Sequence, residues 1–240
     1  MQPAVVCLTG AGISADSGVA TFRDAGGLWE GRRPEEVATP EAWAADRSSV
    51  WRFYQARRRK LSEVQPNAAH AALARFEERC SAASIPFTLI SQNVDDLHQR
   101  AGSSVLSMHG QLAVLRCESC GWTGRDLEHL DDELVPCPLC SHEALRPHVV
   151  WFGEAPFHLD AIEAALARCT HFVSIGTSGA VYPAAGCLAA ARAHGASTFV
   201  NSLDAPDNLH PDDRFLPGRA IEVVPELVKT LSERLNISAR

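Results

Sequence analysis

Short, unbroken apolar runs alternate with amphipathic stretches along most of this 240-residue chain. A short apolar run is typical of a strand buried on both faces, and a 3.6-residue apolar period is typical of a helix. The runs predict strands at 4–8, 87–90, 105–108, 172–175, 198–200 and 220–224. The amphipathic stretches predict helices at 40–43, 48–64, from 68 onward, and at 159–169, 183–194 and 226–235. Strands that alternate with helices indicate an α/β fold with a mostly parallel, doubly wound sheet.

The first predicted strand runs directly into a glycine-containing loop that begins Gly10-Ala11-Gly12. Glycine lets the backbone turn sharply and approach an anion, while the next helix presents its positive N-terminus. The loop therefore indicates nucleotide binding, and Arg23 in Thr21-Phe22-Arg23 is near enough in sequence to meet the same phosphates. The third glycine of the usual dinucleotide fingerprint is absent, as is an acidic residue on a second strand about 20 residues on. A tight strand-to-helix turn without a ligand is the alternative.

Small and polar residues also follow three later strands of the prediction. Gln92 and Asn93 follow one strand, Gly176-Thr177-Ser178 follows another, and Ser202 follows a third. Open α/β sheets bind ligands at the carboxyl ends of their strands, so these clusters predict one shared crevice with the Gly10 loop. Gln92, Asn93 and Asp95 could hydrogen-bond sugar hydroxyls there, or could cap the helix that follows.

Composition narrows the function classes. The chain has 22 Lys and Arg against 29 Asp and Glu, a formal net charge of −7. This balance argues against broad electrostatic binding to nucleic acid or to an anionic membrane. No apolar run approaches the roughly 20 residues that a membrane span needs, and the first strand leaves no room for a signal peptide. We therefore expect a cytoplasmic protein whose eight cysteines are not a disulfide set.

Two Cys-x-x-Cys pairs interrupt the α/β rhythm, Cys117 with Cys120 and Cys137 with Cys140. Two such pairs supply four thiolates to one tetrahedral zinc ion and leave no open coordination position, so the zinc would be structural. A redox pair or incidental core cysteines are the alternatives. The other four cysteines lie among apolar residues and are expected to be buried small hydrophobes: Cys7, Cys80, Cys169 and Cys187.

His109 directly follows a short predicted strand and precedes Gly110. A single histidine is more often structural than catalytic, but its place at a strand end makes it a candidate general base. Tyr54 and Arg57 are three residues apart in a predicted helix and share one face, where a phenol and a guanidinium could grip a carboxylate. The alternative is that 57–60, Arg-Arg-Arg-Lys, is only a charged and solvated helix face.

Taken together, these motifs resemble those of the sirtuins, the NAD-dependent protein-lysine deacylases. The resemblance rests on 10–14 with Ser17-Gly18, on 21–23, 92–95 and 109–110, on the four cysteines, and on 149–154 and 176–178. Departures are small: Ala20 stands where many members have proline, Val94 where isoleucine is usual, and Ser202 where an asparagine often contacts the adenosine ribose.

The resemblance implies that the acyl oxygen of a modified lysine attacks C1′ of the nicotinamide ribose of NAD. Nicotinamide leaves, and a base then helps a ribose hydroxyl attack the alkylimidate; the products are nicotinamide, free lysine and O-acyl-ADP-ribose. His109 would be that base, Asn93 and Asp95 would position the ribose and a water, and Arg23 the pyrophosphate. The residues implied in cofactor binding are Gly10, Ala11, Gly12, Ser14, Ser17, Gly18, Thr21, Phe22, Arg23, Trp29, Gln92, Asn93, Val94, Asp95, Gly176, Thr177, Ser178, Ser202, Leu203, Asp204 and Ala220.

Substrate binding is implied for two further segments. One would add the substrate peptide as a strand through Val149, Val150, Trp151, Phe152, Gly153 and Glu154. The other is the pair Tyr54 and Arg57 with the small residue Ala38, which resembles the class III sirtuins that remove succinyl and malonyl groups.

We therefore expect a Rossmann-like, doubly wound parallel sheet with a small inserted zinc-binding module and a helical insertion. The expected division is a discontinuous NAD-binding domain (1–23, 67–112 and 148–240), a helical insertion with the acyl pocket (24–66) and a zinc ribbon (113–147). We expect a monomer that acts on acylated lysines of proteins. The open alternatives are NAD-dependent mono-ADP-ribosyl transfer and a non-enzymatic zinc-ribbon protein that senses NAD.

Overall fold

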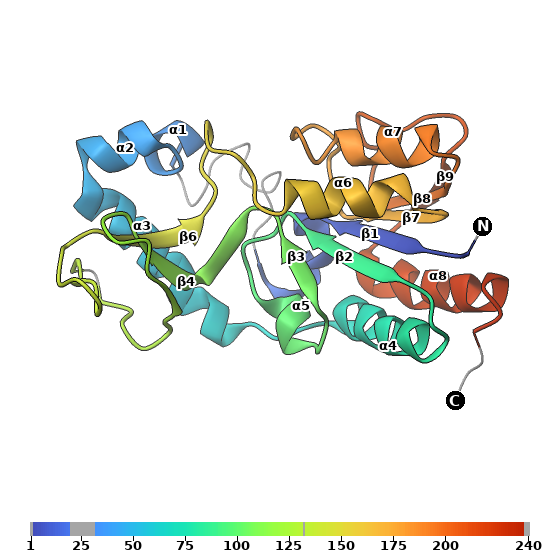
Figure 1. Cartoon of the computed structure of the whole chain (residues 1–240), viewed down its shortest axis with the longest axis horizontal. Helices are drawn as coiled ribbons and strands as arrows, with labels where there is room; N and C mark the ends of the chain where they lie inside the picture. The colour runs from blue at the N-terminus through green and yellow to red at the C-terminus, as the bar shows by residue number, and fades with distance from the viewer. Residues whose placement is uncertain (1, 20–31, 132, 238–240) are drawn as a thin grey trace.

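The chain folds into a large lobe built on a six-stranded sheet and a small lobe beside it (Figure 1). The computed structural model describes residues 2–19, 32–131 and 133–237. In the large lobe the strand order is β3-β2-β1-β7-β8-β9, and every neighbouring pair is parallel. These strands are β1 (Val5–Thr9), β2 (Phe87–Ser91), β3 (Val105–Ser107), β7 (His171–Ile175), β8 (Ser197–Ser202) and β9 (Arg214–Pro217). The predicted parallel α/β sheet is confirmed.

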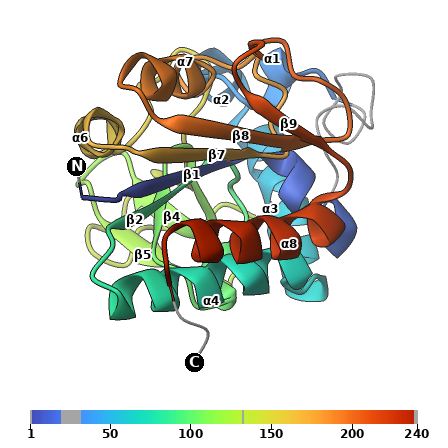
Figure 2. The same cartoon turned by 90° about the vertical axis from the view of Figure 1, so that its right-hand side faces the viewer.

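Helices cover both faces of this sheet (Figure 2). One face carries α4 (Ala68–Ala82) and α8 (Ala220–Arg234), and the other carries α6 (Leu159–Ala167) and α7 (Gly186–Ala193). Alternate residues of β1 serve the two layers: Val5 and Cys7 pack with α4 and α8, whereas Val6 and Leu8 pack with α6 and α7. Both faces are therefore apolar, which explains the unbroken apolar run of the first strand.

The small lobe combines the two insertions. It holds a three-stranded antiparallel sheet in the order β5-β4-β6 and three helices. The elements are β4 (Gly110–Cys117), β5 (Thr123–Arg125), β6 (Leu145–Val149), α1 (Pro34–Val37), α2 (Pro40–Ala45) and α3 (Arg47–Glu63). The side chain of Thr39 accepts a hydrogen bond from Ala42 N, as expected of the N-cap of α2. One hydrophobic cluster joins the helices to the cysteine-bearing segment, so the two predicted modules share a core. Their separate domain boundaries stay a prediction.

The prediction of a strand at 220–224 is wrong. These residues form the first turn of α8, and the last strand of the sheet is β9. Ala220, Val224 and Val228 are buried at helical spacing. Pro225 lies inside the helix, although a proline in a sequence usually indicates the boundary of an element. The residues of β9 are exposed or half-buried, and its Arg-Phe-Leu-Pro segment has only two adjacent large apolar residues, so the apolar signal of this edge strand is short.

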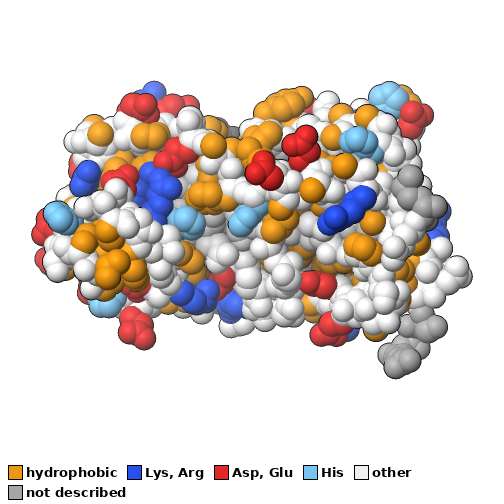
Figure 3. All heavy atoms as spheres, viewed as in Figure 1, with side chains coloured by type: hydrophobic (Ala, Val, Ile, Leu, Met, Phe, Trp, Pro, Cys, Tyr) orange, Lys and Arg blue, Asp and Glu red, His pale blue; other side chains and the backbone are white. Residues whose placement is uncertain are grey.

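The distribution of charged side chains on the surface agrees with the mixed, slightly acidic composition of the chain. On the face in Figure 3, the described Lys and Arg side chains are scattered among acidic and apolar ones. No helix within the described ranges combines the length and the apolarity that crossing a membrane requires.

Candidate active site

The glycine loop after β1 packs directly against the end of β7. A Cβ on Gly10 would lie 2.8 Å from the carbonyl oxygen of Gly176, and one on Gly12 would lie 2.7 Å from Cα of Gly176. The N–H of Gly12 donates to the Gly176 carbonyl at 2.9 Å. Glycine is required here because the backbones of the loops that follow β1 and β7 are in contact. These two strands are neighbours in the middle of the sheet, and the chain leaves them toward opposite edges. This is the topological switch point, at which open α/β sheets bind their ligands.

The expected helix directly after this loop is wrong for the described residues. Ala11–Ile13 and Ala15–Ser17 are two single 3₁₀ turns, and Gly18 follows in the left-handed region at φ 90°. The short turns arise because Ile13 N and Ser14 N bond the carbonyls of Gly10 and Ala11. A ligand bound at this loop would therefore contact two short turns and not the N-terminus of a long helix.

The other predicted strand ends meet the same loop. Gln92 N donates to the carbonyl of Thr9 at 2.9 Å, and Gln92 Nε2 donates to Thr177 Oγ1 at 3.1 Å. Asn93 Nδ2 donates to the carbonyl of Gly10 at 3.1 Å. Three clusters that lie more than 80 residues apart in the chain therefore form one polar site at the carboxyl edge of the sheet.

A buried hydrogen-bond chain organises the centre of this site. Ser14 Oγ donates to Asp95 Oδ2 at 2.9 Å and accepts from Asn93 Nδ2 at 3.1 Å. Asp95 Oδ1 accepts from Leu97 N at 3.1 Å, the first residue of the short helix α5 (Leu97–Arg100), whose N-cap is Asp96. Burial raises the pKa of the Asp95 carboxyl above its ordinary value, against the effect of these hydrogen bonds. The Asp95 carboxylate is therefore held by the chain on both of its oxygens, and its contact with a sugar stays a prediction.

His109 lies where the chain passes from β3 in the large lobe to β4 in the small lobe. Gly110 has φ 80°, and a Cβ there would overlap the carbonyl oxygen of His148, so only glycine allows this crossing. Nδ1 of His109 lies 2.8 Å from the carbonyl oxygen of Gln92. A carbonyl only accepts, so Nδ1 carries the proton and Nε2 keeps its lone pair. Burial lowers the pKa of His109, which keeps the imidazole neutral at pH 7.

The last predicted cofactor residues in the chain, Ser202, Leu203, Asp204 and Ala220, lie at the end of β8 and the start of α8. Ser202 Oγ donates to the carbonyl of Asp204 at 2.6 Å, and the Ser202 carbonyl accepts from Gly218 N at 3.1 Å. Ala220 is buried at the first turn of α8, and Leu203 is 68% exposed. The hydroxyl that replaces the usual asparagine amide therefore closes a turn of its own loop.

Other predicted cofactor residues have local structural partners. Ser17 Oγ accepts from Asn67 Nδ2 at 3.0 Å, which ties the loop to the N-cap of α4. Ser178 Oγ accepts from Ala180 N at 3.4 Å, and the Val94 carbonyl accepts from Leu112 N at 2.8 Å. Thr21, Phe22, Arg23 and Trp29, with Ala20, lie outside the described residues.

The predicted acyl-pocket residues lie in the small lobe on α1 and α3. Tyr54 is buried, and its hydroxyl oxygen accepts a hydrogen bond from Trp151 Nε1 at 2.9 Å. Burial raises the pKa of Tyr54 to about 12, and the nearby charge of Arg57 opposes this rise. The charge of Arg57 also opposes the raised pKa of Asp95, and its guanidinium carbon lies 5.6 Å from the ring centroid of Phe53. Ala38 is buried, and its carbonyl accepts from Phe152 N at 2.9 Å.

The alternative of a solvated face at 57–60 does not describe Arg58. Arg58 is completely buried and bonds Gln55 Oε1 at 2.7 Å and the carbonyl of Asp126. Trp51, Gln55 and Arg59 of the same helix donate to the carbonyls of residues 129–131. These four side chains hold the loop between the two cysteine pairs against α3.

The segment expected to pair with a substrate peptide is a strand only as far as Val149. Beyond it, Val150 N donates to the His109 carbonyl, and Glu154 N donates to the Trp151 carbonyl to close a turn. Glu154 is engaged by Arg116 and Arg146 at 2.8–3.0 Å. Added-strand pairing of a peptide would therefore use carbonyl groups and the N–H of Gly153.

The four cysteines of the predicted zinc module converge as expected. Their sulfur atoms all lie within 4.8 Å of one another, and two sulfur–sulfur pairs, Cys117 with Cys140 and Cys120 with Cys137, are 3.7 Å apart. A tetrahedral site with zinc–sulfur bonds of about 2.3 Å requires sulfurs about 3.8 Å apart. The four thiols thus fit a structural zinc. The remaining cysteines, Cys7, Cys80, Cys169 and Cys187, are buried in the core as predicted.

The sequence interpretation missed several buried polar residues around the site. Arg146 pairs with Glu154 and stacks on Trp151. His70 and His98 lie under the glycine loop, with ring centroids 4.7 Å apart. His70 and His98 contact Ser14 and Thr9, which lie 56 and 89 residues away in the chain, so no local pattern marks the two histidines. The partners of Arg146 lie only five and eight residues further on, and its burial comes from the packing of the small lobe.

The comparisons with known proteins agree with this architecture. The Sir2 family profile matches residues 10–183, and the chain belongs to that family. An "NAD-dependent protein deacylase" of Caulobacter vibrioides is 48% identical over 96% of this chain and 98% of its own length. One of Escherichia coli K12 is 48% identical over 98% of this chain and 84% of its own.

Solved structures give the same result. A Sir2 homologue in complex with NAD aligns with a TM-score of 0.85 at 40% identity, over 96% of this chain and 90% of that one. Sir2Af2 bound to a myristoylated histone peptide aligns with a TM-score of 0.74 at 29% identity, over 98% and 93%.

Proposed function

We propose that this member of the Sir2 family is an NAD-dependent protein-lysine deacylase. The observation that carries the proposal is the geometry of His109, which is held by the Gln92 carbonyl with Nε2 available as a base. The base stands at the edge where Gly10, Asn93 and Thr177 converge. Family membership and relatives named as deacylases support the same activity.

NAD fits the switch point between β1 and β7. The glycine loop and the segment 176–178 would hold its phosphates, with Arg23, and the segment 202–204 with Ala220 would lie beside its adenosine. NAD supplies an electrophilic ribose carbon and nicotinamide as the leaving group. Asn93 and Asp95 would hold the ribose and a water, and His109 would take a proton from a ribose hydroxyl at Nε2.

We further propose that the enzyme accepts succinyl- and malonyl-lysine in addition to acetyl-lysine. Tyr54 and Arg57 are one helical turn apart on α3, and the charge of Arg57 acts on the pKa of both Tyr54 and Asp95. A cation and a phenol close to the catalytic aspartate would meet the terminal carboxylate of an acyl chain. Ala38, the residue that follows α1, is small enough to leave space for that chain.

A panel of acylated peptides tests both proposals. Acetyl-, succinyl- and malonyl-lysine versions of one peptide are incubated with and without NAD, and the products are weighed by mass spectrometry. Loss of the acyl mass and release of O-acyl-ADP-ribose are expected only with NAD. A peptide that gains the mass of ADP-ribose would instead show mono-ADP-ribosyl transfer, and an unchanged peptide would show a binding protein.

A further inference from the structure

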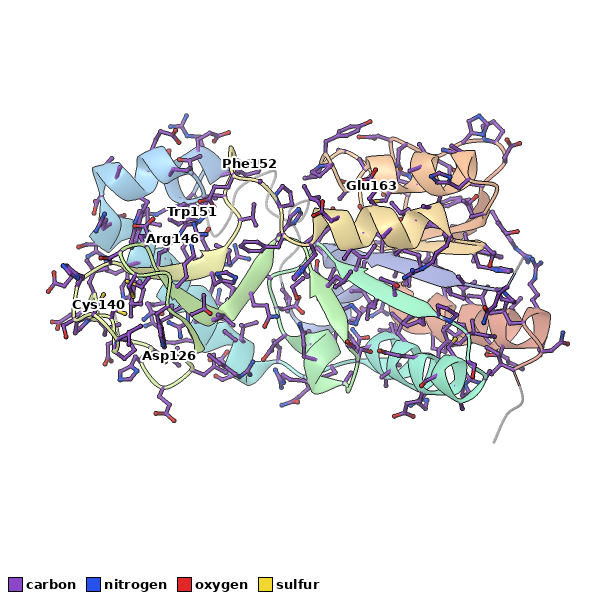
Figure 4. The ribbon with its side chains drawn as sticks, in the orientation of Figure 1. Asp126, Cys140, Arg146, Trp151, Phe152 and Glu163 are labelled. Atoms are coloured by element: carbon purple, nitrogen blue, oxygen red, sulfur yellow. The ribbon has the colours of Figure 1, made fainter. Side chains whose placement is uncertain are left out.

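The side chain of Trp151 connects the peptide-binding turn to the proposed acyl pocket. Trp151 follows β6, is 2% exposed, and points its indole into the small lobe (Figure 4). Its Nε1 donates to the hydroxyl oxygen of Tyr54 at 2.9 Å, and the two ring centroids are 6.3 Å apart. The residue therefore reaches a helix 97 positions earlier in the chain.

This hydrogen bond determines the role that the Tyr54 hydroxyl can play. A phenol has one hydrogen to donate and an oxygen that accepts. The oxygen already accepts from Trp151, and among the described residues no acceptor receives the hydroxyl hydrogen of Tyr54. A buried donor of this kind needs an acceptor, and an acyl carboxylate would supply one.

The indole itself is fixed by an ion pair. The Arg146 guanidinium stacks on the Trp151 ring, with its carbon 3.2 Å from the ring centroid, and donates to Glu154 at 2.8 and 3.0 Å. Glu154 Oε2 also accepts from the backbone N of Trp151 at 2.8 Å. One buried arginine and its carboxylate thus hold both the ring and the backbone of the tryptophan.

We infer that Trp151 is a positioning residue for acyl selection: its indole N–H presets the Tyr54 hydroxyl as a donor toward the acyl carboxylate, and the Arg146–Glu154 pair holds the indole in place. The inference rests on the carboxylate pocket proposed above. It assigns to the side chain of Trp151 a role that is separate from peptide pairing.

Trp151→Phe tests this role because it keeps an aromatic plane for Arg146 and removes only the N–H donor. We expect kcat/KM for succinyl-lysine to fall by about 2- to 12-fold, the effect of one neutral hydrogen bond. Any effect of Trp151 on peptide pairing should lower succinyl- and acetyl-lysine turnover equally, so the ratio of the two kcat/KM values in one peptide should fall by the same factor. In a Tyr54→Phe background, Trp151→Phe should cause no further loss, because the hydroxyl through which it acts is gone.

Two more variants sharpen the experiment. Trp43→Phe is the matched control, since it removes an indole N–H that bonds Glu118 at 2.9 Å and not Tyr54; the ratio of succinyl to acetyl turnover should not change. Arg146→Lys keeps the charge but loses the planar stack and the two-armed contact. It should lower the same ratio in the wild-type background and not in Tyr54→Phe.

The outcomes separate the two hypotheses. If the wild-type enzyme turns over acetyl-lysine but not succinyl- or malonyl-lysine, the carboxylate pocket is wrong and the role of Trp151 is wrong with it. If succinyl-lysine is a substrate but Trp151→Phe lowers both acyl classes equally, or neither, only the role of Trp151 is wrong. An equal loss in the Tyr54→Phe background would contradict it in the same way.

Discussion

His109 shows how single contacts set chemistry at the scale of one residue. The Gln92 carbonyl fixes the proton on Nδ1, and burial lowers the pKa so that Nε2 is unprotonated at pH 7. Ser14 orients Asp95 and Asn93 in the same way, by donating to the first and accepting from the second. His109, Asn93 and Asp95 are therefore each held by a partner before a ligand arrives.

Replacing His109 should separate chemistry from cofactor binding. We expect His109→Ala to bind NAD with near wild-type affinity by calorimetry, since the loops that would hold the phosphates are not touched. Deacylation should fall roughly 100-fold or more, the usual effect of losing an acid–base group. Near-normal turnover in His109→Ala, together with a large loss in an Asn93 variant, would place the base elsewhere.

Arg57 should distinguish charged from neutral acyl groups. A charge-assisted hydrogen bond is worth about 1.5–3 kcal/mol, so Arg57→Met should lower kcat/KM for succinyl- and malonyl-lysine roughly 10- to 150-fold. Acetyl-lysine turnover should barely change, because an acetyl group has no terminal carboxylate. Tyr54→Phe should act in the same direction but more weakly. An equal loss for both acyl classes would contradict the pocket.

At the scale of elements, α3 serves two purposes with different faces. The Tyr54 hydroxyl faces Trp151, while Arg58 and Gln55 bind backbone carbonyls of the loop between the cysteine pairs. Helix α3 and the cysteine module are consequently one structural unit with a shared hydrophobic core.

Removing Arg58 should loosen this unit. Arg58→Met leaves buried carbonyl groups without a donor, and we expect the free energy of unfolding to fall by about 1–3 kcal/mol in a urea titration. Arg52→Met in the same helix is the matched control, because Arg52 is exposed; its unfolding midpoint should barely move. Equal behaviour of the two variants would mean that Arg58 adds no stability.

The cysteine module should depend on its metal. Four thiolates around one ion form a closed site, and the module is too short to be stable without it. Fresh protein should contain one zinc per chain by atomic spectroscopy, and Cys117→Ser or Cys140→Ser should lose the metal and then solubility. Active wild-type protein without zinc would rule out this assignment.

At the scale of the whole molecule, two neutral histidines lie in the interior between the glycine loop, α4 and α5. His98 Nε2 lies 3.0 Å from Thr9 Oγ1, and His70 Nε2 lies 3.5 Å from Ser14 Oγ. Burial lowers the pKa of His70 to about 4 and that of His98 to about 3. Both must stay uncharged for the fold to persist.

The protein should therefore lose stability in acid. The unfolded chain binds protons on these histidines below about pH 6.5, whereas the folded chain does not until about pH 4 or 3. Stability is fully present above pH 6.5 and should fall below it by up to about 1.4 kcal/mol per pH unit for each histidine. Urea titrations of wild type and His98→Gln at several pH values check this. An identical slope for both would show that His98 does not contribute.

The sequence by itself determined most elements of the large lobe and the metal ligands that lie close together in the chain. Apolar runs marked the central strands, the polar clusters at their ends predicted a common site, and the spacing of the cysteines predicted their convergence. These features are local, and parallel strands necessarily bring their carboxyl ends to one edge. Local periodicity is weakest at edges, which is why β9 was missed and the start of α8 was mistaken for a strand.

Only the tertiary structure decided which polar groups support one another. Arg58 could be recognised as buried, and Trp151 as the partner of Tyr54, only once the chain had folded. The partners of Arg58 come from residues 126–129, and that of Trp151 lies 97 residues away. A buried polar group must find a partner wherever the packing brings one, and no sequence period records such a pairing.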